Sequence, residues 1–357
     1  MSGLTLRTAA CEALGARYPI VQTAMGYVAT PELVAASCNA GAFGILACAT
    51  LAAREVAPAI DRVRSLTDRP FGVNFHMFQP GAAQIVDTIL GKGVRAVSFG
   101  RGPDAAMIAR FRAAGVTCIA SVGALRHAQK SAELGADMLI VQGGEGGGHT
   151  GSVATTVLLP QVLDAVKIPV FAAGGFADGR GLAAALAYGA AGVAMGTRFL
   201  MTRDSPVPEA TKARYIKAGV EDVFVTTKLD GIPHRMLRNE LSARIEKASG
   251  AGMLVTALRN ALELKRLTGA SFGDMLRSAG AMARSSHMTF GQALLAANSP
   301  VLLQRAVVQG HPSEGIMASG QVAGRLNDLP TCAELIERIV RDAEARLEAN
   351  CRLLHPA

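Results

Sequence analysis

The chain has 357 residues, of which 50% are hydrophobic and 18% are charged, so it can bury a large core, and global disorder is excluded. Its 36 basic and 28 acidic residues give a net charge of +8, which admits anionic partners. Nucleic acid is not expected among them, because the chain has no Lys/Arg run, only 4% aromatic residues and no Trp.

The cysteines predict a reducing compartment, which we interpret as the cytoplasm. None of the six forms a CxxC motif or a Cys/His cluster with zinc spacing, so no metal site is predicted. Cys38, Cys48 and Cys118 lie in apolar stretches and are expected to be reduced core residues. No signal peptide is evident, and no apolar run of about 20 residues predicts a membrane span, so no membrane partner is expected.

Eight short apolar or β-branched runs recur through the first part of the chain and are typical of buried strands. They are Pro19–Thr23, Phe43–Ala47, Phe71–Phe75, Val94–Phe99, Val116–Ala120, Met138–Gln142, Pro169–Ala173 and Gly192–Gly196. Helix-like segments such as Pro31–Ala40, Leu51–Leu66 and Leu125–Leu134 separate them. Glycines at many junctions are typical of helix C-termini, namely Gly41, Gly93, Gly115, Gly135 and Gly189.

This alternation predicts an α/β protein with a parallel sheet that is buried on both faces. Eight strands close a (β/α)8 TIM barrel, which is the fold we expect. The alternative is an open doubly wound sheet, which needs a Gly-rich turn after its first strand, and Thr23–Gly26 is a poor version of such a turn.

The pattern changes after about Val220. Asp222–Leu237 combines β-branched residues with a turn at Asp230-Gly231, and Asn239–Ala248 and Leu254–Thr268 are helix-like. We therefore expect residues 220–298 to form an inserted, mostly helical substrate or lid subdomain, and 1–219 with 299–357 to form the barrel. The amphipathic segment Thr331–Leu353 predicts a C-terminal helix that packs back on the barrel.

The loops after strands seven and eight are the usual phosphate position of such barrels. Gly174-Gly175 and Gly196-Thr197 occupy these loops, where bare backbone N–H groups and a hydroxyl can bind a phosphate. The alternative is that these glycines only make tight turns.

The loop after strand six, Gln142–Gly151, contains six glycines and one imidazole, His149. It resembles a dinucleotide fingerprint, but it does not open a helix at once, so a Rossmann site is not favoured. We interpret it as a flexible, side-chain-poor loop in which His149 acts as a base and Glu145 gives hydrogen-bonding support. A purely structural histidine is the alternative.

Amide side chains lie at the ends of two predicted strands. Asn74 and Gln142 each offer one acceptor and two donors, which suits the edge of an isoalloxazine ring, although capping of loop backbone is an equal alternative. Five further histidines are treated as non-catalytic: His127 lies on a predicted helix, and four others have no partner spacing, namely His76, His234, His287 and His311. No GxSxG motif predicts a serine hydrolase.

Five segments together resemble the nitronate monooxygenase family: PIVQTAMG, FGVNF, VQGGEGGGHTG, AAGGFADGRG and AMGTRF. The resemblance runs over essentially the whole chain and implies a TIM barrel with one FMN. It implies that His149 is the catalytic base. The residues implied to surround the flavin are Ala24, Met25, Asn74, Gln142, Gly147, Gly174, Gly175, Gly196 and Thr197.

A closer resemblance, to the branch of this family that degrades steroid rings C and D, lies in TTKLDGIPHRMLRNEL, LLAANSPVLL and ASGQVAGRLNDLPTCAELIERIV. It implies an FMN-dependent dehydrogenase that introduces a double bond into a hydroxy-methyl-oxo-octahydroindene-carboxyl-CoA, a steroid-derived (indane) thioester. Typical nitronate oxidisers are similar to the pattern QGxEAGGH followed by Arg. This chain has Gly146 where that pattern has Ala, and Thr150 where it has Arg.

Three alternatives stay open: a nitronate monooxygenase that uses O2, an NAD(P)H:quinone or enoyl-thioester reductase, and a flavin-free binding protein. A small-molecule substrate, a CoA thioester, is the expected partner. The oligomeric state is open, with a homodimer as one option.

Basic residues near the expected active face are candidates for binding the phosphates of CoA, although salt-bridged surface charge is the alternative for each. These candidates are Arg101, Arg203, Lys228, His234, Arg235 and Arg238. Gln321, in the last of the branch motifs, is a further substrate candidate.

Overall fold

The computed structural model describes residues 6–77, 79–100, 104–229, 231–247 and 299–353. The chain forms two compact units. Unit 1 consists of Met1–Gly146, Thr150–Pro206 and Leu326–Ala357, and unit 2 of Gly147–His149 and Val207–Arg325. The chain therefore leaves unit 1 and returns to it twice, once through the three-residue segment Gly147–His149 and once through the long insertion Val207–Arg325.

Unit 1 contains a closed barrel of eight parallel strands in the order β1-β2-β3-β4-β5-β6-β8-β9. The strands are β1 (Ile20–Gln22), β2 (Phe43–Ala47), β3 (Gly72–Asn74), β4 (Ala96–Phe99), β5 (Thr117–Val122), β6 (Met138–Gln142), β8 (Val170–Ala173) and β9 (Gly192–Met195). Pairing of Val21 on β1 with Ala194 on β9 closes the barrel. All eight predicted runs form strands, so the predicted TIM barrel is confirmed and the open sheet is wrong.

The barrel interior is filled by side chains from alternate positions of the strands, as in other eight-stranded barrels. Phe43, Ile45, Ile119, Ile140 and Phe171 belong to this buried cluster. The short helix α1 (Ala9–Leu14) contributes Ala10 and Leu14 to the same cluster. Cys38, Cys48 and Cys118 are buried free thiols, as expected, and burial raises the pKa of each.

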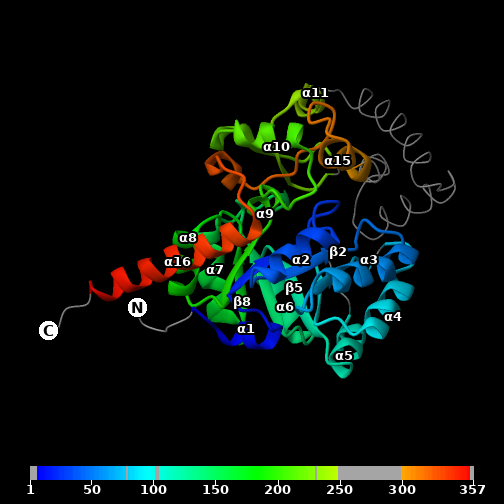
Figure 1. Ribbon diagram of the computed structural model, residues 1–357, viewed down its shortest axis with the longest axis vertical. Helices are drawn as coiled ribbons and strands as arrows, with labels where there is room; N and C mark the ends of the chain where they lie inside the picture. Colours follow the sequence, from blue (N-terminus) through cyan, green and yellow to red (C-terminus); the bar gives the residue numbers. More distant parts are fainter. Residues whose placement is uncertain (1–5, 78, 101–103, 230, 248–298, 354–357) are drawn as a thin grey trace. The chain divides into compact units, whose positions relative to one another are not determined.

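Helices that follow the strands surround the barrel (Figure 1). They are α2 (Pro31–Asn39), α3 (Ala53–Leu66), α4 (Ala82–Lys92), α5 (Ala105–Ala113), α6 (Leu125–Glu133), α7 (Thr155–Ala165), α8 (Gly179–Ala187) and the short α9 (Thr197–Leu200). The five glycines expected at helix ends all adopt left-handed backbone angles.

The C-terminal helix α16 (Cys332–Cys351) packs against α8, as predicted, and the two run side by side in Figure 1. Gly179 makes this close approach possible, because a Cβ there would lie 2.5 Å from the Ala343 nitrogen of α16. The buried side of α16 repeats at helical spacing through Leu335, Ile339 and Ala343.

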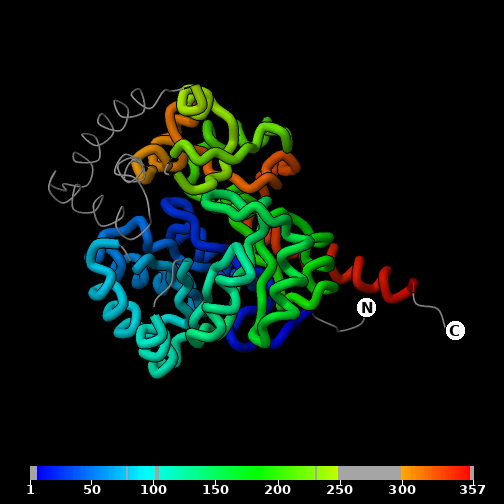
Figure 2. The backbone as a smooth tube through the Cα atoms, turned by 180° about the vertical axis from the view of Figure 1, so that it is seen from behind, coloured from blue at the N-terminus to red at the C-terminus, as the bar shows by residue number. Residues whose placement is uncertain are grey.

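Unit 2 combines helices with a small antiparallel sheet of order β10-β11-β7. Its elements are α10 (Glu209–Ile216), η1 (Val220–Asp222), β10 (Val223–Thr226), β11 (His234–Leu237), α11 (Glu240–Lys247), α15 (Ser299–Val307), η2 (Gln321–Arg325) and β7 (Gly148–His149). Figure 2 shows from behind that its earlier part, in yellow-green, lies beside its later part, in orange. A hydrogen bond from Thr211 Oγ1 to the Ala306 carbonyl, 2.6 Å, joins these two parts.

The bounds of unit 2 differ from those expected for the insertion, 220–298. Residues 207–219 belong to it because α10 is bonded to α15, and residues 299–325 belong because α15 and the following segment pack on the sheet. The predicted turn at Asp230-Gly231 lies between β10 and β11, which pair in antiparallel fashion. Asp230 itself and the predicted helix Leu254–Thr268 lie outside the described residues.

Candidate functional site

The residues expected around the cofactor fall into two groups. Those at the carboxyl ends of the barrel strands all belong to unit 1: Ala24, Met25, Asn74, Gln142, Gly174, Gly175, Gly196 and Thr197. Gly147 and His149, by contrast, belong to unit 2. Apart from Asn74 on β3, the first group follows β6, β8, β9 and β1, which are consecutive neighbours around the barrel. The sequence prediction therefore converges on one arc of the barrel rim.

The Gly174-Gly175 turn after β8 needs glycine at both positions. The φ angles are +92° and +83°, in the left-handed region that side chains rarely adopt. A Cβ on Gly174 would lie 3.1 Å from both the Gly143 carbonyl oxygen and the Gly146 nitrogen. The turn is thus packed against the loop after β6, and it carries no side chain.

The Gly196-Thr197 turn after β9 lies against the segment that follows β1. A Cβ on Gly196 would approach Thr23 Oγ1 at 3.2 Å and Met25 Sδ at 3.4 Å. Thr197 is the first residue of α9, and both residues are half-buried. Since β8 and β9 pair directly, with Ala173 opposite Ala194, the two glycine turns follow neighbouring strands at the same rim.

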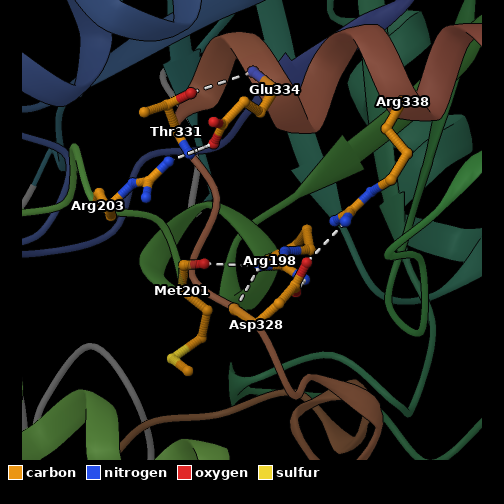
Figure 3. Close-up of polar contacts among 7 residues, drawn as sticks. All are labelled: Arg198, Met201, Arg203, Asp328, Thr331, Glu334 and Arg338. Atoms are coloured by element: carbon orange, nitrogen blue, oxygen red, sulfur yellow. Dashed lines mark hydrogen bonds and ion pairs between the residues drawn. The ribbon is translucent and has the colours of Figure 1, made fainter.

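Arg198, the next residue, anchors this turn to the chain before α16 (Figure 3). Its guanidinium is 3% exposed and donates to Asp328 Oδ1 at 2.7 Å and to the Met201 carbonyl at 2.6 Å. Arg338 of α16 binds the other oxygen of Asp328, Oδ2, at 2.7 Å. One carboxylate therefore joins the β9 turn to the C-terminal helix.

Burial and charge act in opposite directions on the pKa values of this ion pair. Burial raises the pKa of Asp328, but hydrogen bonds and charges from Arg198 and Arg338 outweigh burial, so the pKa lies below its ordinary value. Burial lowers the pKa of Arg198, and Asp328 opposes that shift. Removal of either partner would leave the other charge poorly compensated.

A second contact in Figure 3 accounts for Arg203, one of the candidates for binding CoA. Arg203 Nη2 lies 2.5 Å from Glu334 Oε2, and Glu334 also forms a capping box with Thr331 at the start of α16. Arg203 is therefore engaged within unit 1, and Arg101 lies outside the described residues.

The loop after β6 is tied to the start of α7 by Glu145. Its carboxylate accepts from the Thr155 backbone N–H at 2.9 Å and from Thr155 Oγ1 at 2.7 Å. Thr155 Oγ1 also lies 3.2 Å from the Gly174 carbonyl oxygen. The expected supporting role of Glu145 is confirmed by these bonds, which connect the loops after β6 and β8.

Glycine at position 146 leaves space that the Gln142 side chain occupies. A Cβ on Gly146 would lie 2.4 Å from Gln142 Cγ and 2.5 Å from its Nε2. Gln142 and Ile140 lie two residues apart on β6, so both point to the barrel interior, Gln142 at the rim. Asn74 lies at the end of β3 and donates from Nδ2 to the Ser98 carbonyl at 3.1 Å.

The catalytic candidate His149 forms the edge of the sheet of unit 2. Gly148 pairs with Arg235 and His149 with His234, both antiparallel. A Cβ on Gly147 would lie 2.5 Å from the backbone of Ser319 and Gly320, and Gly148 has a φ of +71°. The glycines before the histidine thus allow a two-residue strand, β7, to pack closely within unit 2.

The substrate candidates in unit 2 do not share one environment. His234 is 4% exposed, and its neighbour Arg235 points to the opposite face of β11. Arg238 places its guanidinium carbon 4.4 Å from the centre of the Phe224 ring, and Lys228 Nζ bonds to the Glu246 carbonyl. Gln321 begins η2 and is half-buried.

Sequence reasoning missed two features of the site. The contact between His149 and His234 joins residues from different sequence segments, and neither segment shows a spacing that could have revealed it. The Arg198–Asp328 pair is also long-range in sequence, although the basic residue in the segment AMGTRF was a signal. In the described part of the chain, no three His, Cys, Asp or Glu residues gather as metal ligands, and no helix is long and apolar enough to cross a membrane.

Comparison with known proteins decides the family. A family model described as nitronate monooxygenase matches residues 7–87 and 80–342, which include the barrel and the loops above. The chain belongs to the nitronate monooxygenase family. The family and the enzyme class expected from the motifs, a flavin-dependent oxidoreductase, are thereby confirmed.

Two relatives within this family cover nearly the whole chain. A Rhodococcus jostii protein, 52% identical over 345 residues, covers 97% of this chain and 98% of its own, and a Mycobacterium tuberculosis protein, 52% identical over 354 residues, covers 98% and 100%. Both are named (3aS,4S,5R,7aS)-5-hydroxy-7a-methyl-1-oxo-octahydro-1H-indene-4-carboxyl-CoA dehydrogenase. The solved structure of FabK from Thermotoga maritima is similar, with a TM-score of 0.79 and 32% identity, covering 98% of this chain and all of that one.

Proposed function

We propose that the chain is an FMN-dependent dehydrogenase that introduces a double bond into a steroid-derived indane acyl-CoA. The observation that carries this proposal is the 52% identity, over nearly the full length, to two relatives named as dehydrogenases of such a thioester. A reductase or a nitronate oxidase of the same family is the competing function.

The residues at the barrel rim fit a flavin phosphate. Gly174-Gly175 and Gly196-Thr197 follow neighbouring strands, and the only side chain among these four residues is that of Thr197, which offers a hydroxyl beside the backbone N–H groups. The amides of Asn74 and Gln142 have the donors and acceptors that a flavin ring edge requires. FMN is favoured over FAD because the sequence offers one phosphate position and no Rossmann-type element for an adenosine half.

His149 is the proposed base. The thioester acidifies the proton on its α-carbon, and an imidazole can accept that proton near neutral pH. When bound, the flavin supplies the acceptor for the two electrons and the hydrogen that the β-carbon loses as the double bond forms. Glu145 supports the site indirectly, because its bonds to Thr155 tie the loop after β6, which follows Gln142, to the start of α7.

Two experiments test the proposal. Heat release of the cofactor followed by mass spectrometry should yield FMN. Release of FAD, or of no flavin, would overturn the assignment of FMN as the cofactor. Turnover should then be compared on the indane acyl-CoA with an artificial electron acceptor, on alkyl nitronates with O2, and on an enoyl thioester with NADH. The first substrate should react fastest, and a faster reaction of either other substrate would establish the competing function.

A further inference from the structure

The sheet of unit 2 aligns three polar side chains across its strands. Thr226 on β10 pairs with His234 on β11, and His234 pairs with His149 on β7. Directly opposite residues of antiparallel strands have their side chains on the same face of the sheet. Thr226, His234 and His149 therefore form one cross-strand row, which ends at the proposed base.

Within this row the two imidazoles contact each other. The ring centres of His149 and His234 are 5.0 Å apart, and the rings are inclined at 71°, so one ring presents its edge to the other. His149 is exposed, whereas His234 is 4% exposed. The exposed ring thus leans on a ring that the interior of unit 2 holds in place.

The far end of the row is fixed by a carboxylate. Thr226 is 6% exposed, and its Oγ1 donates to Glu246 Oε1 of α11 at 2.6 Å. The same oxygen accepts from the Lys228 backbone N–H at 3.1 Å. Thr226, the cross-strand neighbour of His234, therefore has a defined orientation. This restricts the space in which the His234 ring can move.

The backbone of His149 is fixed as well. Gly147 packs against the backbone of Ser319 and Gly320, and the Ser319 N–H donates to the Arg235 carbonyl at 3.3 Å on the neighbouring strand. The main chain of β7 is thus set by its packing and pairing, and the remaining freedom of His149 is rotation of its side chain. The contact with His234 limits that rotation.

We propose that His234 is a positioning residue, whose ring holds the His149 imidazole in the orientation that removes the α-proton. This inference rests on the proposed function, in which His149 is the base. A base contributes fully only when its ring is held within hydrogen-bond reach of the proton, and a misplacement of about 1 Å can cost about a hundredfold in rate. His234 is buried, which disfavours a direct role in binding CoA phosphates.

The test uses the flavin-loaded enzyme and the indane acyl-CoA. His234→Ala removes the ring and should lower kcat about 10- to 100-fold, with KM within about twofold of wild type and flavin content unchanged. His234→Phe keeps a flat ring and should recover most of the lost kcat. His311→Ala, an exposed histidine elsewhere in unit 2, is the control and should behave as wild type.

The outcomes separate this inference from the proposed function. Loss of activity in His149→Ala together with wild-type kcat in His234→Ala would overturn the inference alone, as would an equal loss in the Phe and Ala variants. Retention of activity in His149→Ala would instead overturn the assignment of His149 as the base. If His234→Ala does not fold, His234→Gln fills the space without a ring, and an unchanged kcat in that variant would overturn the proposal.

Discussion

A single methyl group at position 147 should displace the strand that carries the proposed base. In Gly147→Ala the new Cβ would lie 2.5 Å from backbone atoms of Ser319 and Gly320, whereas non-bonded carbon atoms prefer about 3.5 Å, so the two backbones must separate by about 1 Å. Such overpacking costs about 1–3 kcal/mol. The backbone pairing of β7 contributes a similar amount, at about 0.5–1.5 kcal/mol for each hydrogen bond. Separation of β7 from β11 is therefore the available relief.

Because Gly147 belongs to unit 2 and not to the rim residues of unit 1 proposed to hold the flavin phosphate, we expect Gly147→Ala to keep its flavin absorbance. It should lose about a hundredfold in kcat on the indane acyl-CoA, because His149 loses its place in the sheet. Thermal unfolding should show a destabilisation of at most about 3 kcal/mol. Gly91→Ala is the matched control: it lies in α4 with open space around its Cβ and should be stabilising by about 0.5–1 kcal/mol. Wild-type kcat and stability in Gly147→Ala would refute the packing argument.

Further substitutions test the other parts of the site. His149→Ala should lose at least about a hundredfold in turnover while keeping its flavin, and activity within a few fold of wild type would exclude the base. Gly175→Glu should purify without flavin, because a carboxylate would meet the phosphate, and a fully yellow variant would count against this phosphate position. Asp328→Asn should lower the free energy of unfolding in urea by about 2–4 kcal/mol near neutral pH, because Arg198 stays buried without its counter-charge. The pKa of Asp328 is lowered, so this difference should be present above about pH 4 and disappear as the pH falls through the folded-state value; a difference that persists below it would contradict the ion pair.

Much of the barrel could be predicted because its signals are local. Each strand is a continuous apolar run, and the runs Phe43–Ala47 and Met138–Gln142 match their observed strands residue for residue. The start of α16 follows from Thr331 and Glu334, which form the capping box within one turn. Signals of this kind come from residues that are neighbours in the sequence, so they can be recognised without knowledge of the tertiary structure.

The site was predictable only in part. The glycine turns could be placed because the rim of a barrel follows from its strands, but the role of each glycine in the loop after β6 could not. Gly146 makes space for Gln142, whereas Gly147 packs on Ser319 and Gly320, and both roles depend on tertiary contacts. The addition of β7 to the sheet of unit 2 was missed for the same reason, since β7 has only two residues and exists only through its pairing with β11.

The most direct test of the central claim is anaerobic mixing of the purified, flavin-loaded protein with the indane acyl-CoA while the flavin absorbance is followed. The account predicts that the thioester bleaches the flavin in one turnover, that the corresponding free acid does so far more slowly because it lacks an acidified α-proton, and that His149→Ala is bleached at least about a hundredfold more slowly. Equal bleaching by the free acid, or no bleaching by the thioester together with rapid reaction of simple alkyl nitronates, would contradict it.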